Sequence, residues 1–139
     1  MKRNIIMLSL FALIIIILFI SLLRTNNDGK TRIEDSIVND FNSHRSLFDN
    51  IANKVLLNDE DISYELDSNI NSDLDLSKLF SMGYHSIHSA DKSFVYFIKD
   101  SNFGFSQGLV FSKEGGQPVS PYLTSLQELD NHWYLYKMK

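Results

Sequence analysis

Residues 32–57, RIEDSIVNDFNSHRSLFDNIANKVLL, show the clearest amphipathic pattern in the chain. Apolar side chains recur in steps of four, four, seven, three and four residues, at Ile33, Ile37, Phe41, Phe48, Ile51 and Val55. These steps place them on one face of an α-helix, while charged and amide side chains occupy the opposite face. The spacing therefore predicts one long helix that needs a partner for its apolar face and turns its polar face, including Asp40, to solvent.

The partner is predicted in the C-terminal half, where apolar residues alternate with a period of two from Tyr84 onward. We expect strands at 84–89, 93–99, 105–112 and 132–137, with turns at 100–104 and 113–116. The stretch before the last strand leaves two alternatives. A short helix could begin at Ser120-Pro121, or a strand over 122–129 could turn through Asp130-Asn131. The hairpin is favoured because Asp-Asn tolerates the positive φ of a two-residue turn.

Between the helix and the strands, residues 58–75 hold seven acidic side chains and no Lys or Arg. This composition predicts a solvated connection with at most one short strand. A short helical turn over 74–80 should then end at Gly83. The predicted fold class is therefore α+β, with the long amphipathic helix packed on an antiparallel β-meander of four to five strands.

Residues 5–23, IIMLSLFALIIIILFISLL, form an uncharged apolar run of nineteen residues. As a helix this run would reach the ~30 Å of a bilayer's hydrocarbon core. It is longer than the ~7–15 apolar residues of a cleaved signal, and neither an A-x-A-like site nor a lipoprotein cysteine follows it. The sequence thus predicts an N-terminal transmembrane helix over 1–24, an uncleaved signal anchor in the lipid bilayer. A linker over 25–31 and a domain over 32–139 should follow.

Lys2 and Arg3 precede this run, and Arg24, Lys30 and Arg32 follow it, so the positive charges of the two flanks nearly balance. The charge on the very short N-terminal tail favours a single-pass protein of the cell membrane, with a cytoplasmic N-terminus and an extracytoplasmic domain. Beyond residue 24, ten Lys and Arg accompany seventeen Asp and Glu, a net charge of −7. This balance provides no basic footprint for nucleic acid.

Residues 104–108 match the G-x-S-x-G pattern of α/β-hydrolases, and Asp130 and His132 follow Ser106 in the order of their catalytic triad. The pattern works only where a strand turns sharply into a helix, whereas residues 109–111 continue a strand pattern. We therefore interpret Gly104 as a turn residue and Gly108 as a close-packing or bulge glycine. A small hydrolase stays the less favoured alternative.

Other chemistry-bearing residues lack the spacing of a site, so no catalytic, cofactor-binding or metal-binding residue is assigned. Side chains with carboxylate or amide oxygens occur at alternate positions, as in a calcium-binding loop, at Asp67, Asn69, Asn71, Asp73 and Asp75. Ser72 and Lys78 stand where such a loop requires glycine and glutamate. His85 and His88 would point to opposite faces of a strand and could not hold one metal. The sequence also lacks a P-loop, so we expect no cofactor and no enzymatic activity.

Aromatic side chains gather near the C-terminus, at Phe97, Phe103, Phe105, Phe111, Tyr122, Trp133, Tyr134 and Tyr136. Because bulky residues follow one another in HWYLYK (132–137), both faces of this strand need cover. One face, with Trp133, should pack against Phe41 and Phe48 of the long helix. The other is either covered by residues 58–82 or exposed as a docking patch.

Several C-terminal features occur together: the run 108–112, the turn 115–118, Leu126 with Leu129, and the segment 131–136. Together they resemble the end of small single-pass proteins of unknown function in Gram-positive bacteria of the Bacillus type. The resemblance implies a membrane-tethered α+β domain with no known activity. We expect a non-catalytic module that binds a protein or another component of the cell envelope, or regulates a membrane partner. The alternatives are an assembly subunit held by its transmembrane helix and the small hydrolase.

Overall fold

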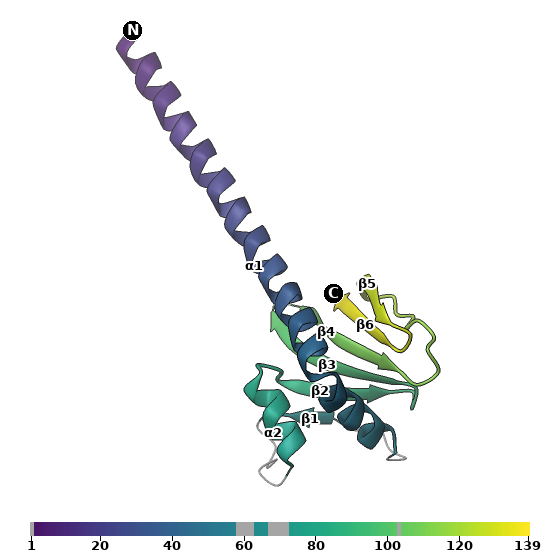
Figure 1. Cartoon of the computed structure of the whole chain (residues 1–139). Coiled ribbons are helices and arrows are strands. Elements are labelled where there is room, and N and C mark those ends of the chain that lie inside the picture. The colour runs from purple at the N-terminus through teal and green to yellow at the C-terminus, as the bar shows by residue number, and fades with distance from the viewer. Residues whose placement is uncertain (1, 58–62, 67–72, 103) are drawn as a thin grey trace. The chain divides into compact units, whose positions relative to one another are not determined.

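The computed structural model describes residues 2–57, 63–66, 73–102 and 104–139, with the backbone alone over 2–12 and 19–31. The chain divides into two compact units, Met1–Ile33 and Glu34–Lys139. Its elements are α1 (Lys2–Leu56), β1 (Ser63–Glu65), α2 (Leu74–Ser81), β2 (Ser86–Ala90), β3 (Phe94–Asn102), β4 (Phe105–Ser112), β5 (Leu123–Asp130) and β6 (Trp133–Met138) (Figure 1). The α+β class with a long helix is therefore confirmed, and the stretch predicted as a linker (25–31) is helical backbone.

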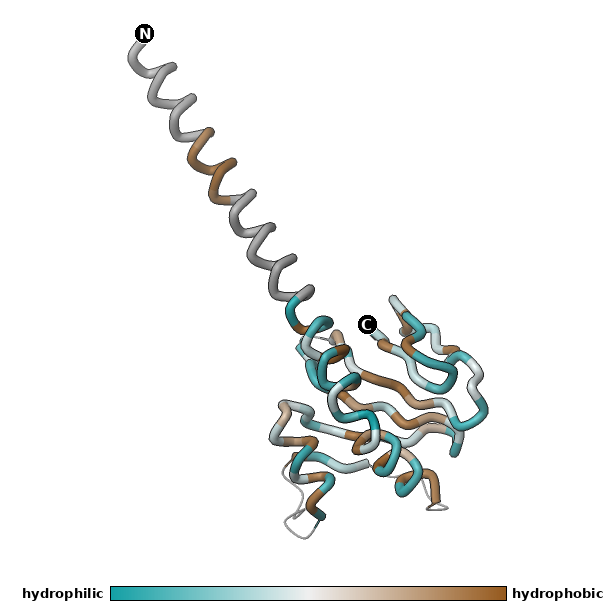
Figure 2. Tube along the Cα trace, in the orientation of Figure 1, coloured by the Kyte–Doolittle hydropathy of each residue, from teal (hydrophilic) through white to brown (hydrophobic). Residues whose placement is uncertain are grey.

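The predicted transmembrane anchor is wrong. Among the residues whose side chains are described, no helix offers an apolar stretch long enough to cross a membrane. The side chains described in the first half of α1 are Leu13–Leu18, which are brown in Figure 2 and exposed. The prediction of a single-pass membrane protein with an extracytoplasmic domain is corrected with it.

Helix α1 is broken at His44, whose backbone is not helical (φ −132°, ψ 30°). The break lies within the seven-residue step between Phe41 and Phe48, so it separates two short apolar faces rather than one regular stripe. Both aromatic rings still contact each other, with centroids 6.3 Å apart. Ile37 and Ile51, one on each side of the break, are likewise buried. The predicted amphipathic helix is confirmed over this part of α1.

The six strands form one antiparallel sheet in the order β1-β2-β3-β4-β6-β5. The sheet exceeds the predicted four to five strands because the short β1 pairs with β2. The favoured hairpin is confirmed, since β5 and β6 pair and no helix forms over 120–129 in the structure. The predicted meander holds only as far as β4, because β6 lies between β4 and β5.

This strand order gives the connection 113–122 an unusual course. It leaves β4 beside Phe111, which pairs with Trp133, and enters β5 at Leu123, which pairs with Met138 at the opposite end of β6. The connection must therefore travel the length of β6, about 20 Å. The Tyr134 hydroxyl donates a hydrogen bond to the Gly115 carbonyl (2.8 Å), and Pro118 is buried. We name this connection the crossing loop.

The two faces of the sheet are packed differently. On the face toward α1, Trp133 is fully buried, and its ring centroid lies 5.3 Å from that of Phe41 and 5.9 Å from that of Phe48. The predicted contact of these three residues is thus confirmed. On the other face, a buried cluster of Val110, Tyr134 and Tyr136 is flanked by partly buried apolar residues: Phe94, Tyr96, Ile98, Leu123, Leu126 and Met138. The crossing loop contacts this cluster through Tyr134.

The polar face of α1 is not simply solvated, contrary to expectation. Asp40 pairs with the ammonium of Lys99, which also donates a hydrogen bond to the Ser36 hydroxyl (2.9 Å). Glu34 pairs with Lys137, and Arg45 with Asp130. The polar residues of α1 therefore clamp it to β3, β5 and β6.

Asp40→Asn should lower the free energy of unfolding by about 1–3 kcal/mol, because the Lys99 side chain is only 14% exposed and would lose its counter-charge. Urea unfolding of the full chain, followed by circular dichroism, measures the change. The matched control is Asp35→Asn at an exposed position of the same helix, which should stay within about 0.5 kcal/mol. Equal effects of the two substitutions would mean that the ion pair contributes nothing to stability.

Candidate functional site

The residues of the G-x-S-x-G hypothesis are not brought together. Ser106 pairs with Met138, whereas Phe111 pairs with Trp133, the neighbour of His132. Five residues of strand separate these two positions along β4, or about 17 Å. A base must approach its nucleophile to hydrogen-bond distance, so His132 cannot activate Ser106 in this arrangement.

The other two partners of that hypothesis have structural roles. The Asp130 carboxylate binds the guanidinium of Arg45, and this hydrogen bond lowers the pKa of Asp130. A ring nitrogen of His132, Nδ1, lies 2.7 Å from the carbonyl oxygen of Ser112. Ser106 lies within the regular strand β4 and not on a strand-to-helix turn. A Cβ at Gly108 would lie 1.8 Å from the carbonyl oxygen of Phe97, which confirms Gly108 as a close-packing glycine.

Of the histidines and acidic residues, His85, His88 and Glu65 line a second groove of about 500 Å³ beside β1 and β2. The His88 Nδ1 atom lies 2.8 Å from the Ser63 hydroxyl across β1 and β2, and the His85 Nδ1 atom lies 3.3 Å from the Ser86 hydroxyl. Over the described ranges, no three His, Asp or Glu side chains lie close enough together to hold a metal ion. The Ser63–His88 contact was missed by the sequence analysis because it depends on the pairing register of a three-residue strand.

Of the calcium pattern, Asp67, Asn69 and Asn71 lie outside the described residues. Asp73 caps α2: its carboxylate accepts hydrogen bonds from the backbone N–H groups of Asp75 (3.1 Å) and Leu76 (3.3 Å). It also binds the ammonium of Lys54, and this hydrogen bond lowers the pKa of Asp73. Asp73 therefore joins the start of α2 to the end of α1. As predicted, the helix stops at Gly83, where φ is +91°.

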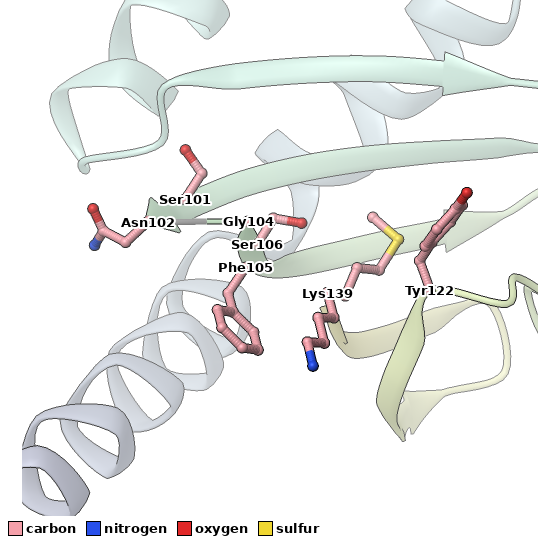
Figure 3. Close-up of a pocket in the computed structure, with 8 residues that line it drawn as sticks. Ser101, Asn102, Gly104, Phe105, Ser106, Tyr122 and Lys139 are labelled. Carbon is pink, nitrogen blue, oxygen red and sulfur yellow. The ribbon is translucent and has the colours of Figure 1, made fainter.

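A groove of about 500 Å³ opens where β3 meets β4 and where β6 ends. We name it the end groove and define it by its lining: Ser101, Asn102, Gly104, Phe105, Ser106, Tyr122, Met138 and Lys139. Figure 3 shows Phe105 on one side and Tyr122 on the other, with Lys139 between them. The Lys139 backbone N–H donates a hydrogen bond to the Tyr122 carbonyl (2.8 Å), which fixes the floor of the groove to the segment that enters β5.

The side chains of the end groove are mainly aromatic and hydroxyl-bearing. Its apolar walls carry large exposed aromatic surfaces, since Phe105 is 51% and Tyr122 66% exposed. The Lys139 ammonium lies 6.0 Å from the centroid of the Phe105 ring, and the other polar side chains of the lining carry hydroxyls or, at Asn102, an amide. The lining includes no side-chain carboxylate or imidazole that could act as a general base near pH 7.

The sequence shows Phe105 and Tyr122 as members of an aromatic-rich region, but it does not show that they lie on opposite sides of one groove. They flank one groove because β6 lies between β4 and β5, an order that no local pattern specifies. No sequence pattern indicated that Met138 and Lys139 would form the floor of a groove.

Comparisons with known proteins place no further residues in the site. No family model, curated protein or solved structure matches the chain. The likeness of the C-terminal strands to small proteins of Bacillus-type bacteria stays a prediction. The candidate site accordingly rests on the geometry of the end groove.

Proposed function

We propose that the Glu34–Lys139 unit is a non-catalytic binding module whose ligand occupies the end groove. The observation that carries the proposal is the pair of exposed aromatic side chains, Phe105 and Tyr122, on opposite sides of an open groove. Aromatic side chains are over-represented among residues that dominate binding energy, because they bury large area and lose few rotamers.

Two further features support this proposal. The ends of β3, β4 and β6 contribute to the groove, and Phe105 belongs to β4. Tyr122, the last residue of the crossing loop, is held beside them by the hydrogen bond from the Lys139 backbone N–H to its carbonyl oxygen. In addition, no side-chain carboxylate or imidazole lines the groove beside Ser106, and the His132 and Asp130 side chains are engaged at the far end of the strands. These features favour recognition over hydrolysis.

A fragment library screened by NMR against the full chain tests the proposal. Binding fragments should shift the backbone amides of Phe105, Tyr122 and Lys139. The double variant Phe105→Ala with Tyr122→Ala should weaken the best fragment at least about tenfold, because both apolar walls are lost. Val119→Ala is the control, since Val119 is 96% exposed and lies outside the groove lining, and it should leave the affinity unchanged.

Two results would contradict the proposal. In the first, the fragments bind elsewhere on the unit and the double variant does not change their affinity. In the second, a serine-directed phosphonate labels Ser106 in the folded chain and does not label the Ser106→Ala variant. The latter result would favour the hydrolase.

A further inference from the structure

Strand β5 is the long free edge of the sheet. It pairs with β6 on one side, and no strand among the described residues pairs with its other side. The opposite edge, β1, has only three residues, whereas β5 has eight. About half of the backbone N–H and C=O groups of an edge strand point away from the sheet and can pair with another extended chain.

The sequence of β5, LTSLQELD, contains neither Lys nor Pro, the residues that most often protect an edge from such pairing. Its pairing with β6 is irregular between Leu123 and Ser125 and again between Glu128 and Asp130. Four consecutive residues, 125–128, remain in regular register. Edge pairing is therefore confined to a short central window, which gives few hydrogen bonds and requires a side-chain anchor nearby.

The end groove supplies that anchor. Tyr122 comes directly before β5, three residues from Ser125, which corresponds to about 10 Å along an extended chain. A partner strand paired with residues 125–128 would reach the end groove a few residues beyond its paired portion. One of its side chains could then enter between Tyr122 and Phe105.

Charge indicates which segments fit. Residues 34–139 contain sixteen Asp and Glu against eight Lys and Arg, a net charge of −8. The two charged side chains of β5 are both acidic: Asp130 binds Arg45, and Glu128 is exposed. A basic segment would be attracted to this surface and an acidic one repelled.

We propose that β5 accepts an extended basic segment of a partner protein as a seventh strand, with one apolar side chain of that segment seated in the end groove. This inference rests on the proposed function and adds the partner's chemistry to it. Main-chain hydrogen bonds to β5 would fix the direction and register of the partner segment. The end groove would favour an apolar side chain at one position of that segment, and the acidic side chain of β5 would favour basic residues in it.

A random-peptide display library panned on the full chain provides the probe. The enriched peptides should be basic and alternate apolar with polar residues. The most enriched peptide is then synthesised with N-methyl groups at alternate positions, in two complementary sets. One set removes the N–H groups that face β5 and should weaken binding at least tenfold, while the other set should bind as the parent peptide does.

Two charge-reversal variants complete the test. Glu128→Lys should weaken the peptide by about tenfold at low salt, and the difference should shrink as salt is added. Asp91→Lys makes the same charge change at the β2–β3 turn, away from β5, and should have little effect. Circular dichroism of both variants establishes that they are folded.

Failure of this inference can be told apart from failure of the proposed function. Equal binding by both N-methylated sets, with loss of binding in Tyr122→Ala, would overturn strand pairing and leave the groove as a binding site. Enrichment of acidic peptides would overturn the assigned charge. A dimer in light scattering that Glu128→Lys dissociates would show that a second copy of the chain occupies β5. The absence of any enriched peptide would overturn the inference outright.

Discussion

Trp133→Ala is expected to lower the free energy of unfolding by about 3–5 kcal/mol. The indole is fully buried, and its ring centroid lies 5.0 Å from that of Phe111 and 5.3 Å from that of Phe41. Its Nε1–H also donates a hydrogen bond to the Asp49 carboxylate of α1 (2.9 Å). The substitution therefore opens a cavity between α1 and the sheet and removes a direct link between them. Such a loss is a large part of a typical domain's stability.

Urea unfolding monitored by far-ultraviolet circular dichroism measures this effect. Tryptophan fluorescence cannot serve, because Trp133 is the chain's single tryptophan. Trp133→Phe keeps most of the apolar volume and loses the hydrogen bond, so it should destabilise the protein less than alanine does. Tyr122→Ala, at a side chain that is 66% exposed, should stay within about 0.5 kcal/mol. A nearly neutral Trp133→Ala would show that this residue is not part of the core.

Gly108→Ala should destabilise the protein at least as much as Trp133→Ala does. We expect it to lower the free energy of unfolding by about 4 kcal/mol or more. The added Cβ would lie 1.8 Å from the carbonyl oxygen of Phe97 and 2.9 Å from its carbonyl carbon. Both atoms belong to the backbone of the paired strand β3, so no side-chain rotation can relieve the clash. The β3–β4 pair would have to separate at the centre of the sheet, next to the irregular register between Ile98 and Asp100.

Gly116→Ala is the matched control for this substitution. A Cβ at Gly116, in the crossing loop, meets no atom within 4 Å. Its thermal midpoint should therefore stay near that of the parent chain or rise slightly. If Gly108→Ala unfolded at the same temperature as Gly116→Ala, the close approach of β3 and β4 would be refuted.

Local sequence patterns were sufficient for most of the elements. The period of two gave β2, β3, β4 and β6 within a few residues. The β5–β6 hairpin was correctly favoured over a helix, but its turn is Asn131-His132 rather than Asp130-Asn131, and neither Asp130 nor Asn131 has the positive φ on which the prediction relied. Gly83 marked the end of α2. Each of these signals depends on neighbouring residues along the chain, either through side-chain alternation or through the backbone preferences of a turn.

Features that depend on contacts between residues far apart in the sequence could not be predicted from local patterns. The position of β6 between β4 and β5 follows from pairing across the crossing loop, so the end groove could not be foreseen. Asp40 was expected in solvent because helical periodicity says nothing of a lysine 59 residues away in sequence. The anchor over 1–24 was inferred from the composition of a segment alone, and the described side chains do not support a span.

The crossing loop also has a consequence for the order in which the chain folds. Strand β6 is made after β5, yet it must reach β4 before β5 can take its place at the edge. The two strands are joined by a two-residue turn, so their pairing is local and fast, whereas pairing with β4 must first close the longer crossing loop. The C-terminal hairpin therefore forms as a unit and docks late, carrying Trp133 into the core as it does so. Until this hairpin has docked on β4, the domain lacks its edge strand, the walls and floor that Tyr122 and Met138 give the end groove, and the Trp133 ring between α1 and the sheet.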